Sequence, residues 1–305
     1  MSATGKYTVW AWVMGSAFMA SACAANNTAS ESSKPAKAEP ASSAATTDAD
    51  SVALKKHYPQ VGDVERSRKV IVTKLHGAPK DKKPVDLERG IARERADECL
   101  KIVDRECVTL KVTYRVLTKR DLVKGKATDQ ALASQGKTYF VDRSGAKPGV
   151  TLEDGSSPSE AEISQVRKDF SKAPSTAKLL DALPDSLKVG DSLDAFAKAY
   201  AAHDLGAGDD HWASVDYSVK VKAFGEVDGK KTVILEVVGE LDSGALDWGQ
   251  MKMKGTGMLE VFVDSGAPAR GSFSGPVTLA LPNGEGQLDG TLEHNEVSSY
   301  SFVGG

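Results

Sequence analysis

Strict alternation of apolar and polar positions marks the middle and the C-terminal part of the chain. In residues 108–116, Val, Leu, Val, Tyr and Val alternate with Thr, Lys, Thr and Arg, and residues 215–222 repeat this pattern. A period of two predicts strands with one apolar and one solvated face. Further strands, separated by clusters of Gly, Pro, Asn and Asp, are expected at residues 231–241, 251–263, 269–281 and 287–302. The C-terminal part is therefore predicted to be an antiparallel meander.

Three helical segments are expected to interrupt the strands, between about residues 157 and 203. The first begins at a Ser-Pro-Ser-Glu sequence in which Ser157 is expected to cap the helix and Glu160 to complete a capping box. The others are expected at residues 177–183 and 192–203, the last with one apolar face. Because strands of this length curve, the sheet is expected to have a concave side on which these helices lie. The predicted fold is β-rich α+β: a long curved antiparallel sheet or half-barrel with a helical insert.

The N-terminal segment has the pattern of an export signal. Lys6 precedes the apolar residues 8–20, a stretch shorter than the roughly 20 residues that span a bilayer. Ala-Ser-Ala then precedes Cys23, which resembles the bacterial lipobox, although Ala20 stands where leucine is commonest. The resemblance implies a signal peptide at residues 1–22 and a diacylated Cys23 that carries palmitate at the mature N-terminus. The alternative is an ordinary cleavage site that leaves Cys23 as an incidental thiol.

A polar segment of mostly small residues follows Cys23. Residues 24–52 are rich in Ala, Ser, Thr, Asn, Glu, Lys and Pro and contain almost no large apolar side chain. Such a segment buries too little surface to offset the entropy lost on ordering. Residues 23–52 are therefore expected to be a disordered, lipidated tether, followed by a β-rich globular domain at residues 53–305. The expected location is the cell envelope, attached to the outer membrane by the lipid anchor.

Two further cysteines, Cys99 and Cys107, lie eight positions apart. In an exported protein such a pair most simply forms a disulfide. A metal site is the alternative, but two thiols without a nearby His supply too few ligands. In the chain-entropy model a disulfide that closes so small a loop stabilises the fold by roughly 2.5 kcal/mol. Such a disulfide would stabilise a local segment and would not determine the fold.

The charge and the sequence motifs exclude several classes of partner and cofactor. The chain has 39 Lys and Arg residues against 42 Asp and Glu residues, so no basic excess suggests a nucleic-acid partner. The sequence contains no phosphate-binding loop and no dinucleotide-binding motif, and we predict no cofactor and no metal.

The sequence Gly-Asp-Ser-Leu at residues 190–193 matches the motif of the GDSL esterases, in which the serine is the nucleophile. Here it falls late in the chain, and no later His has an Asp three positions before it to complete a triad. Asp191 or Ser192 is expected instead to cap the third helix, and no catalytic residue is predicted.

Histidines also occur in the segment at residues 203–211 and at positions 57 and 76. Residues 203–211 contain two His and three Asp that would suit a metal ion, but their composition is typical of a solvated loop. His57 and His76, which flank the first strand without an acidic or thiol cluster beside them in the sequence, are expected at the surface.

The order of a lipid anchor, a curved sheet and covering helices is similar to that of the LolA and LppX envelope lipoproteins, whose half-open barrels hold acyl chains. The similarity implies a non-catalytic lipoprotein that binds an apolar ligand or a partner protein. The alternatives are a scaffold that presents a surface at the membrane and a hydrolase. An apolar pocket would be lined by residues drawn from Val112, Tyr114, Phe170, Phe196, Tyr200, Met251, Met253 and Leu259. The sequence itself favours the alternative that these side chains form an ordinary dry core.

Replacing Cys23 with Ala should abolish palmitate labelling and move the protein from the membrane fraction to the soluble fraction, because the acyl chains would lose their attachment site. Metabolic labelling and cell fractionation measure both effects. Unchanged labelling of the Cys23→Ala variant would contradict the lipid anchor.

Overall fold

The computed structural model describes residues 51–80, 82–123, 126–170, 176–206, 213–245 and 249–303. The predicted signal peptide, Cys23 and nearly all of the predicted tether lie outside these residues. Within the described residues, no helix has both the length and the apolar character that a membrane span requires.

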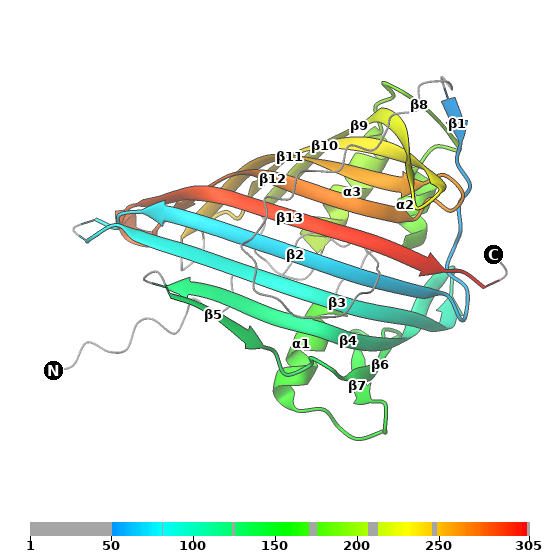
Figure 1. Ribbon diagram of the computed structural model, residues 1–305, viewed down its shortest axis with the longest axis horizontal. Helices are drawn as coiled ribbons and strands as arrows, with labels where there is room; N and C mark the ends of the chain where they lie inside the picture. The colour runs from blue at the N-terminus through cyan, green and yellow to red at the C-terminus, as the bar shows by residue number, and fades with distance from the viewer. Residues whose placement is uncertain are drawn as a thin grey trace, which may run out of the picture.

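An eleven-stranded antiparallel sheet dominates the described residues (Figure 1). The strand order is β7-β6-β4-β3-β2-β13-β12-β11-β10-β9, and β5 also pairs with β4. The strands are β2 (Val64–Gly77), β3 (Val85–Val103), β4 (Glu106–Val123), β5 (Lys126–Ala131), β6 (Thr138–Asp142), β7 (Gly149–Leu152), β9 (Ser214–Val227), β10 (Lys230–Asp242), β11 (Gln250–Phe262), β12 (Pro268–Ala280) and β13 (Gln287–Ser301). The sheet curves without closing, which confirms the predicted β-rich half-barrel.

The first and last long strands join the two halves of the chain into one sheet. β13 pairs with β2 from Asp289 opposite His76 to Ser301 opposite Val64. Strands β9 to β13 form the predicted meander, each paired with the next. The Asp228-Gly229 turn between β9 and β10 has positive φ at both residues, the geometry that tight hairpins favour.

Three helices of the described residues lie on one side of the sheet (Figure 1). They are α1 (Glu160–Phe170), α2 (Thr176–Ala182) and α3 (Asp194–Gly206). β1 (Ser51–Ala53) and β8 (Ser186–Lys188) form a separate two-stranded sheet, and η2 (Pro282–Gly284) is a short 3-10 turn. The predicted helical insert is therefore confirmed.

The capping box of α1 lies two residues later than predicted. The backbone N–H and hydroxyl of Ser159 both donate to Glu162, and the backbone N–H of Glu162 points back to the Ser159 hydroxyl at 3.4 Å. Ser157 and Glu160 were thus the wrong pair. The spacing is the same in both pairs, but Lys137 and Tyr139 also donate to Glu162, which ties the later pair to the sheet.

The apolar side chains form two main clusters at opposite ends of the sheet. The larger packs the apolar face of α3, including Phe196 and Tyr200, against β9 to β12. The smaller packs Val166 and Phe170 of α1 against β4 and β6. Between the two clusters, the concave face of β3, β2 and β13 carries mostly charged and polar side chains.

Gly257 allows two strands of the larger cluster to approach closely. A Cβ atom added at Gly257 would clash with the backbone oxygen of Ser272 and crowd Phe273 on β12. Gly271 on β12 differs, because the nearest atom to an added Cβ is Leu259 Cδ1 at 3.9 Å. One glycine is therefore required by a backbone contact, and the other has room for a methyl group.

We expect Gly257→Ala to lower the free energy of unfolding by about 2–3 kcal/mol, because the backbone of β12 must move. The matched control Gly271→Ala should stay within about 0.5 kcal/mol of the wild type. Urea denaturation of both variants measures the difference, and equal effects would contradict the register of β11 on β12.

Candidate functional site

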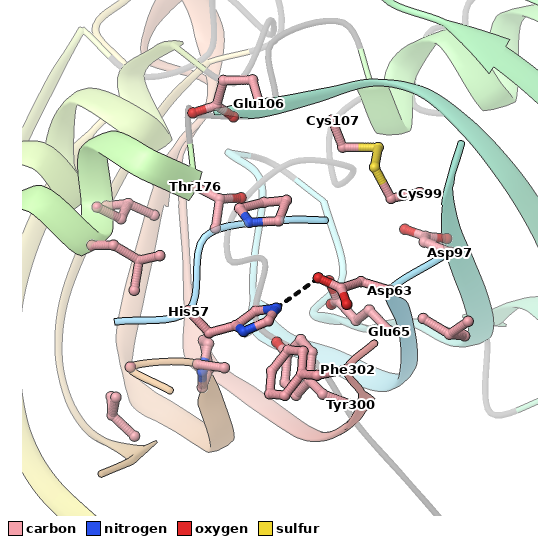
Figure 2. Close-up of a pocket in the computed structure, with 18 of the residues that line it drawn as sticks. His57, Asp63, Glu65, Asp97, Cys99, Glu106, Cys107, Thr176, Tyr300 and Phe302 are labelled. Carbon is pink, nitrogen blue, oxygen red and sulfur yellow. Dashed lines mark hydrogen bonds and ion pairs between the residues drawn. A yellow bond between two sulfur atoms is a disulfide. The ribbon is translucent and has the colours of Figure 1, made fainter. Parts of the chain in front are cut away.

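A cavity of about 220 Å³ lies between α2, α3 and the concave face of the sheet (Figure 2). One wall is apolar and consists of side chains from the three helices and β11. Its main members are Phe170, Leu179, Leu180, Phe196, Tyr200 and Leu259. Thr176 is exposed and also lines the cavity, so the cavity reaches the surface beside the first turn of α2.

Four of the eight side chains predicted to contact a ligand line this cavity: Phe170, Phe196, Tyr200 and Leu259. The other four lie outside its lining, in the packed clusters. Val112 and Tyr114 belong to the smaller cluster, and Met251 and Met253 belong to the larger one. The charged and polar middle of the concave face lies between these two clusters, so the concave face is not one continuous apolar surface.

The opposite wall of the cavity is charged. Glu65 on β2 and Asp97 on β3 are cross-strand partners, and both line the cavity (Figure 2). Arg95 on β3 also lines it. Nη2 of Arg95 donates to Oδ2 of Asp97 at 2.6 Å, and the guanidinium lies 4.6 Å from the centre of the Phe170 ring. Arg143, which follows β6, adds a second guanidinium to the lining. The cavity therefore has an apolar side and a charged side.

The pKa of the Glu65 carboxyl group is raised strongly. Burial, reinforced by the neighbouring Asp97 carboxylate, raises the pKa of Glu65 from 4.5 to about 8, although Arg95 opposes the shift. Burial also raises the pKa of Asp97, against the attraction of Arg95 and Arg93. The raised pKa favours the protonated form of Glu65 at neutral pH, and this form can donate a hydrogen bond.

Several polar atoms beside the cavity have unused hydrogen-bonding capacity. Nε and Nη1 of Arg95 and Oδ1 of Asp97 are buried and have no hydrogen-bond partner among the described residues. Nη1 of Arg95 lies 3.8 Å from Oδ2 of Asp169 on α1, which is an ion-pair distance but too long for a hydrogen bond. Each such unsatisfied group costs about 1–3 kcal/mol.

The charged wall continues as a row of ion pairs along the middle of the concave face. Lys69 on β2 lies 3.7 Å from Glu296 on β13, which also contacts His294 at 3.2 Å. Burial and the nearby Lys69 lower the pKa of His294. Burial favours protonation of Glu296, but Lys69 and His294 outweigh it and lower its pKa. The opposite charges of Lys69 and Glu296 lie close together, so the charges of this row are paired within the row.

α1 is attached to this row by its last turn. The Asp169 carboxylate accepts a hydrogen bond from the Tyr114 hydroxyl at 2.6 Å and lies 3.5 Å from Nη1 of Arg93. The same turn places Phe170 at the cavity. The electrostatic contacts of Asp169 therefore position one apolar side chain of the lining.

His57, which was predicted to lie at the surface, is half-buried and lines the cavity. Its Nε2 contacts Oδ2 of Asp63 at 2.7 Å, and its ring packs on Phe302 with centroids 3.9 Å apart (Figure 2). Asp63 also accepts the backbone N–H groups of Gln60 and Val303. Asp63 is six positions away in sequence, so only the folded loop reveals the pair. His76 is exposed as expected, but it contacts Asp86 at 2.6 Å.

The predicted disulfide lies in the wall of the cavity. The sulfur atoms of Cys99 and Cys107 are at disulfide distance (Figure 2). They link β3 to β4 close to the turn of this hairpin. The hairpin in turn holds α2: Glu106 accepts the backbone N–H of Ala177, and Arg105 makes a two-pronged contact with Asp181. The disulfide thus stabilises the hairpin that fixes the helix over the cavity.

The esterase motif lies away from this cavity's lining. Ser192 is exposed, and its hydroxyl donates to Oδ1 of Asp194 at 2.6 Å. The first helical hydrogen bond of α3 is accepted by Leu193, so neither Asp191 nor Ser192 occupies the cap position. Asp191 instead accepts the backbone N–H of Lys188.

Most of the loop at residues 203–211, which was predicted to be solvated with a metal site as the alternative, lies outside the described residues. Residues 207–212 are not among the described residues, and the side chains of residues 203–206 are not described either. Within the part of the chain that is described, no group of three or more His, Cys, Asp or Glu side chains could hold a metal ion.

Comparison with known proteins shows no family for this chain. No protein-family model matches it, and no curated protein matches it. A solved structure of lipovitellin, titled for its lipid–protein interactions, shares 7% identity at a TM-score of 0.41, covering 81% of this chain and 26% of the lipovitellin chain. DynF, from the dynemicin biosynthesis pathway of Micromonospora chersina, shares 10% identity at a TM-score of 0.22, covering 87% and 92%.

This chain thus spans about a quarter of the lipovitellin chain. At these TM-scores neither similarity indicates a shared function. The similarity in plan to the LolA and LppX lipoproteins stays a prediction.

Because the folded protein holds a proton on Glu65 that the unfolded chain releases above pH 4.5, the stability from this group is complete below pH 4.5 and is lost as pH rises to about 8. Glu65→Gln cannot lose a proton there. We therefore expect the melting temperature of the variant, relative to the wild type, to rise steadily from pH 4.5 to pH 8.

The control is Glu293→Gln, which changes an exposed carboxylate on β13. Its difference from the wild type should stay constant over the same pH range. A constant difference for Glu65→Gln as well would contradict the protonation of Glu65.

Proposed function

We propose that this protein is a lipid-anchored, non-catalytic protein of the bacterial cell envelope that binds an apolar ligand in the cavity between α2, α3 and the sheet. The observation that carries the proposal is the cavity itself, with its wall of Leu179, Leu180, Phe196 and Leu259. Apolar pockets with a few converging polar groups are the usual form of ligand sites.

The size of the cavity limits the ligand. At about 220 Å³ it is larger than the engineered cavity of about 150 Å³ that binds benzene. It is smaller than the roughly 300 Å³ at which sites for drug-sized ligands begin. A single medium-length acyl chain or one ring fits this range, and a complete diacyl lipid does not. The ligand is therefore one chain, or the end of one chain of a larger lipid.

The envelope location rests on the sequence. The export signal and Cys23 supply the anchor, and the Cys99–Cys107 disulfide suits an oxidising compartment. A lipid anchor would hold the cavity close to a membrane, which is the source of acyl chains.

The scaffold and hydrolase alternatives have less support. A scaffold needs no unfilled space beside unsatisfied polar groups, because a filled core is more stable. For a hydrolase, the described contacts of Ser192 lead to Asp194 and do not include a histidine base.

Decanol at about 100 times its dissociation constant should stabilise the purified domain by about 2.7 kcal/mol, which raises the melting temperature by several degrees. Leu179→Trp places an indole in the cavity and should abolish this rise. The matched control Leu152→Trp changes a partly buried leucine outside the lining of the cavity. Decanol should still raise the melting temperature of this control.

Native mass spectrometry of the domain purified from cells should also show a co-purifying lipid, and Leu179→Trp should remove it. The proposal fails if neither decanol nor decanoate stabilises the wild-type domain. It fails equally if Leu179→Trp binds as well as the control.

A further inference from the structure

We propose that the ligand is a monocarboxylate with a single alkyl chain, whose carboxylate is received by Arg95 and Glu65 at the charged wall while the chain packs against α2, α3 and β11. This inference rests on the proposed binding function and specifies the chemical class of the ligand. It predicts a particular orientation: head toward β2 and β3, tail toward Leu179 and Leu259.

The polar atoms at the wall favour a hydrogen-bond acceptor. Two donors of Arg95, Nε and Nη1, have no hydrogen-bond partner among the described residues, and Glu65 supplies a third donor in its protonated form. The unsatisfied acceptor here is Oδ1 of Asp97. A carboxylate presents two acceptor oxygens and no donor, which matches a guanidinium beside a carboxylic acid.

The other carboxylates of the lining are already engaged by the fold. Asp63 accepts from His57 and from two backbone N–H groups, and Glu106 accepts the backbone N–H of Ala177. Asp63 and Glu106 are therefore held by hydrogen bonds within the fold. Arg143 adds positive charge to the same lining.

The surroundings of Glu65 set the pH range of binding. β3 supplies Asp97, Arg95 and Arg93, and β13 supplies Glu296 and Tyr300. Arg143, His57 and Asp63 complete the charged and titratable groups around this side of the cavity, together with Asp169 of α1 near Arg95. Among them, Glu65 changes its protonation near pH 8, where it turns from a donor into a repelling anion.

The experiment compares three probes that share one chain and differ only in the head group: decanoate, decanol and decylamine. Isothermal titration of the purified domain at pH 7 should show that affinity decreases from decanoate to decanol to decylamine. Decanoate should bind about tenfold more tightly than decanol. Between pH 7 and pH 9 the affinity for decanoate should fall about tenfold, because only the protonated form of Glu65 is competent.

Two variants separate the head-group site from the cavity. Glu65→Gln keeps a donor that cannot ionise and should remove the loss of decanoate affinity between pH 7 and pH 9. Arg95→Lys keeps the charge beside Asp97 but loses the planar fork, and should reduce the preference for decanoate over decanol. Arg115→Lys, an exposed arginine on β4, is the matched control and should bind like the wild type.

Binding of all three probes with equal affinity, or tightest binding of decylamine, would overturn the carboxylate site and leave the apolar cavity standing. Binding of none of them would overturn the proposed function as well. Retention of the full pH dependence in Glu65→Gln would show that another group controls it and would refute the role of Glu65.

Discussion

The ion pairs buried on the concave face of β3, β2 and β13 are the constraint on which the rest of this architecture depends. A buried charge is costly unless it is paired and hydrogen-bonded, so each of these residues limits the positions of its neighbours. Arg95 requires Asp97, and Lys69 requires Glu296. Because the row crosses the middle of the sheet, the apolar side chains gather in clusters on either side of it, and a cavity remains where an apolar wall and the charged wall meet.

The helices meet this row in different ways. α1 contributes Asp169 to the ion pairs and Phe170 to the cavity, so its last turn is fixed by charge and by packing together. α2 is held from outside by Glu106 and by the exposed Arg105–Asp181 pair, while its leucines face the cavity. Exposed ion pairs contribute little free energy, so α2 is held mainly by its buried side chains Ala177 and Leu180.

Much of the fold could be predicted from the sequence, because alternation along β9 to β13 and the apolar stripe of α3 each correspond to one buried face. β2 and β3 were harder to predict. Their buried face carries charged residues: Lys69, Arg93, Arg95 and Asp97. Apolar residues normally mark the buried face of a strand, so this rule does not identify the inner face of β2 and β3.

The candidate site was only half predictable for the same reason. Phe170, Phe196, Tyr200 and Leu259 were found because they are apolar residues on predicted inner faces. Glu65, Arg95 and His57 were not found, because their roles come from contacts across strands and loops. The one local indication of the charged wall in the sequence is a set of charged residues at alternate positions in β3: Arg93, Arg95 and Asp97. The same pattern is typical of an exposed strand face.

A crystal structure of the domain with decanoate brominated at the far end of its chain tests the central claim most directly. The bromine position locates the tail, and the electron density at the other end locates the carboxylate. The account predicts the carboxylate within hydrogen-bond distance of Arg95 and Glu65 and the bromine among Leu179, Phe196 and Leu259. A bromine beside Glu65, or a cavity that stays empty in the presence of saturating ligand, would contradict it.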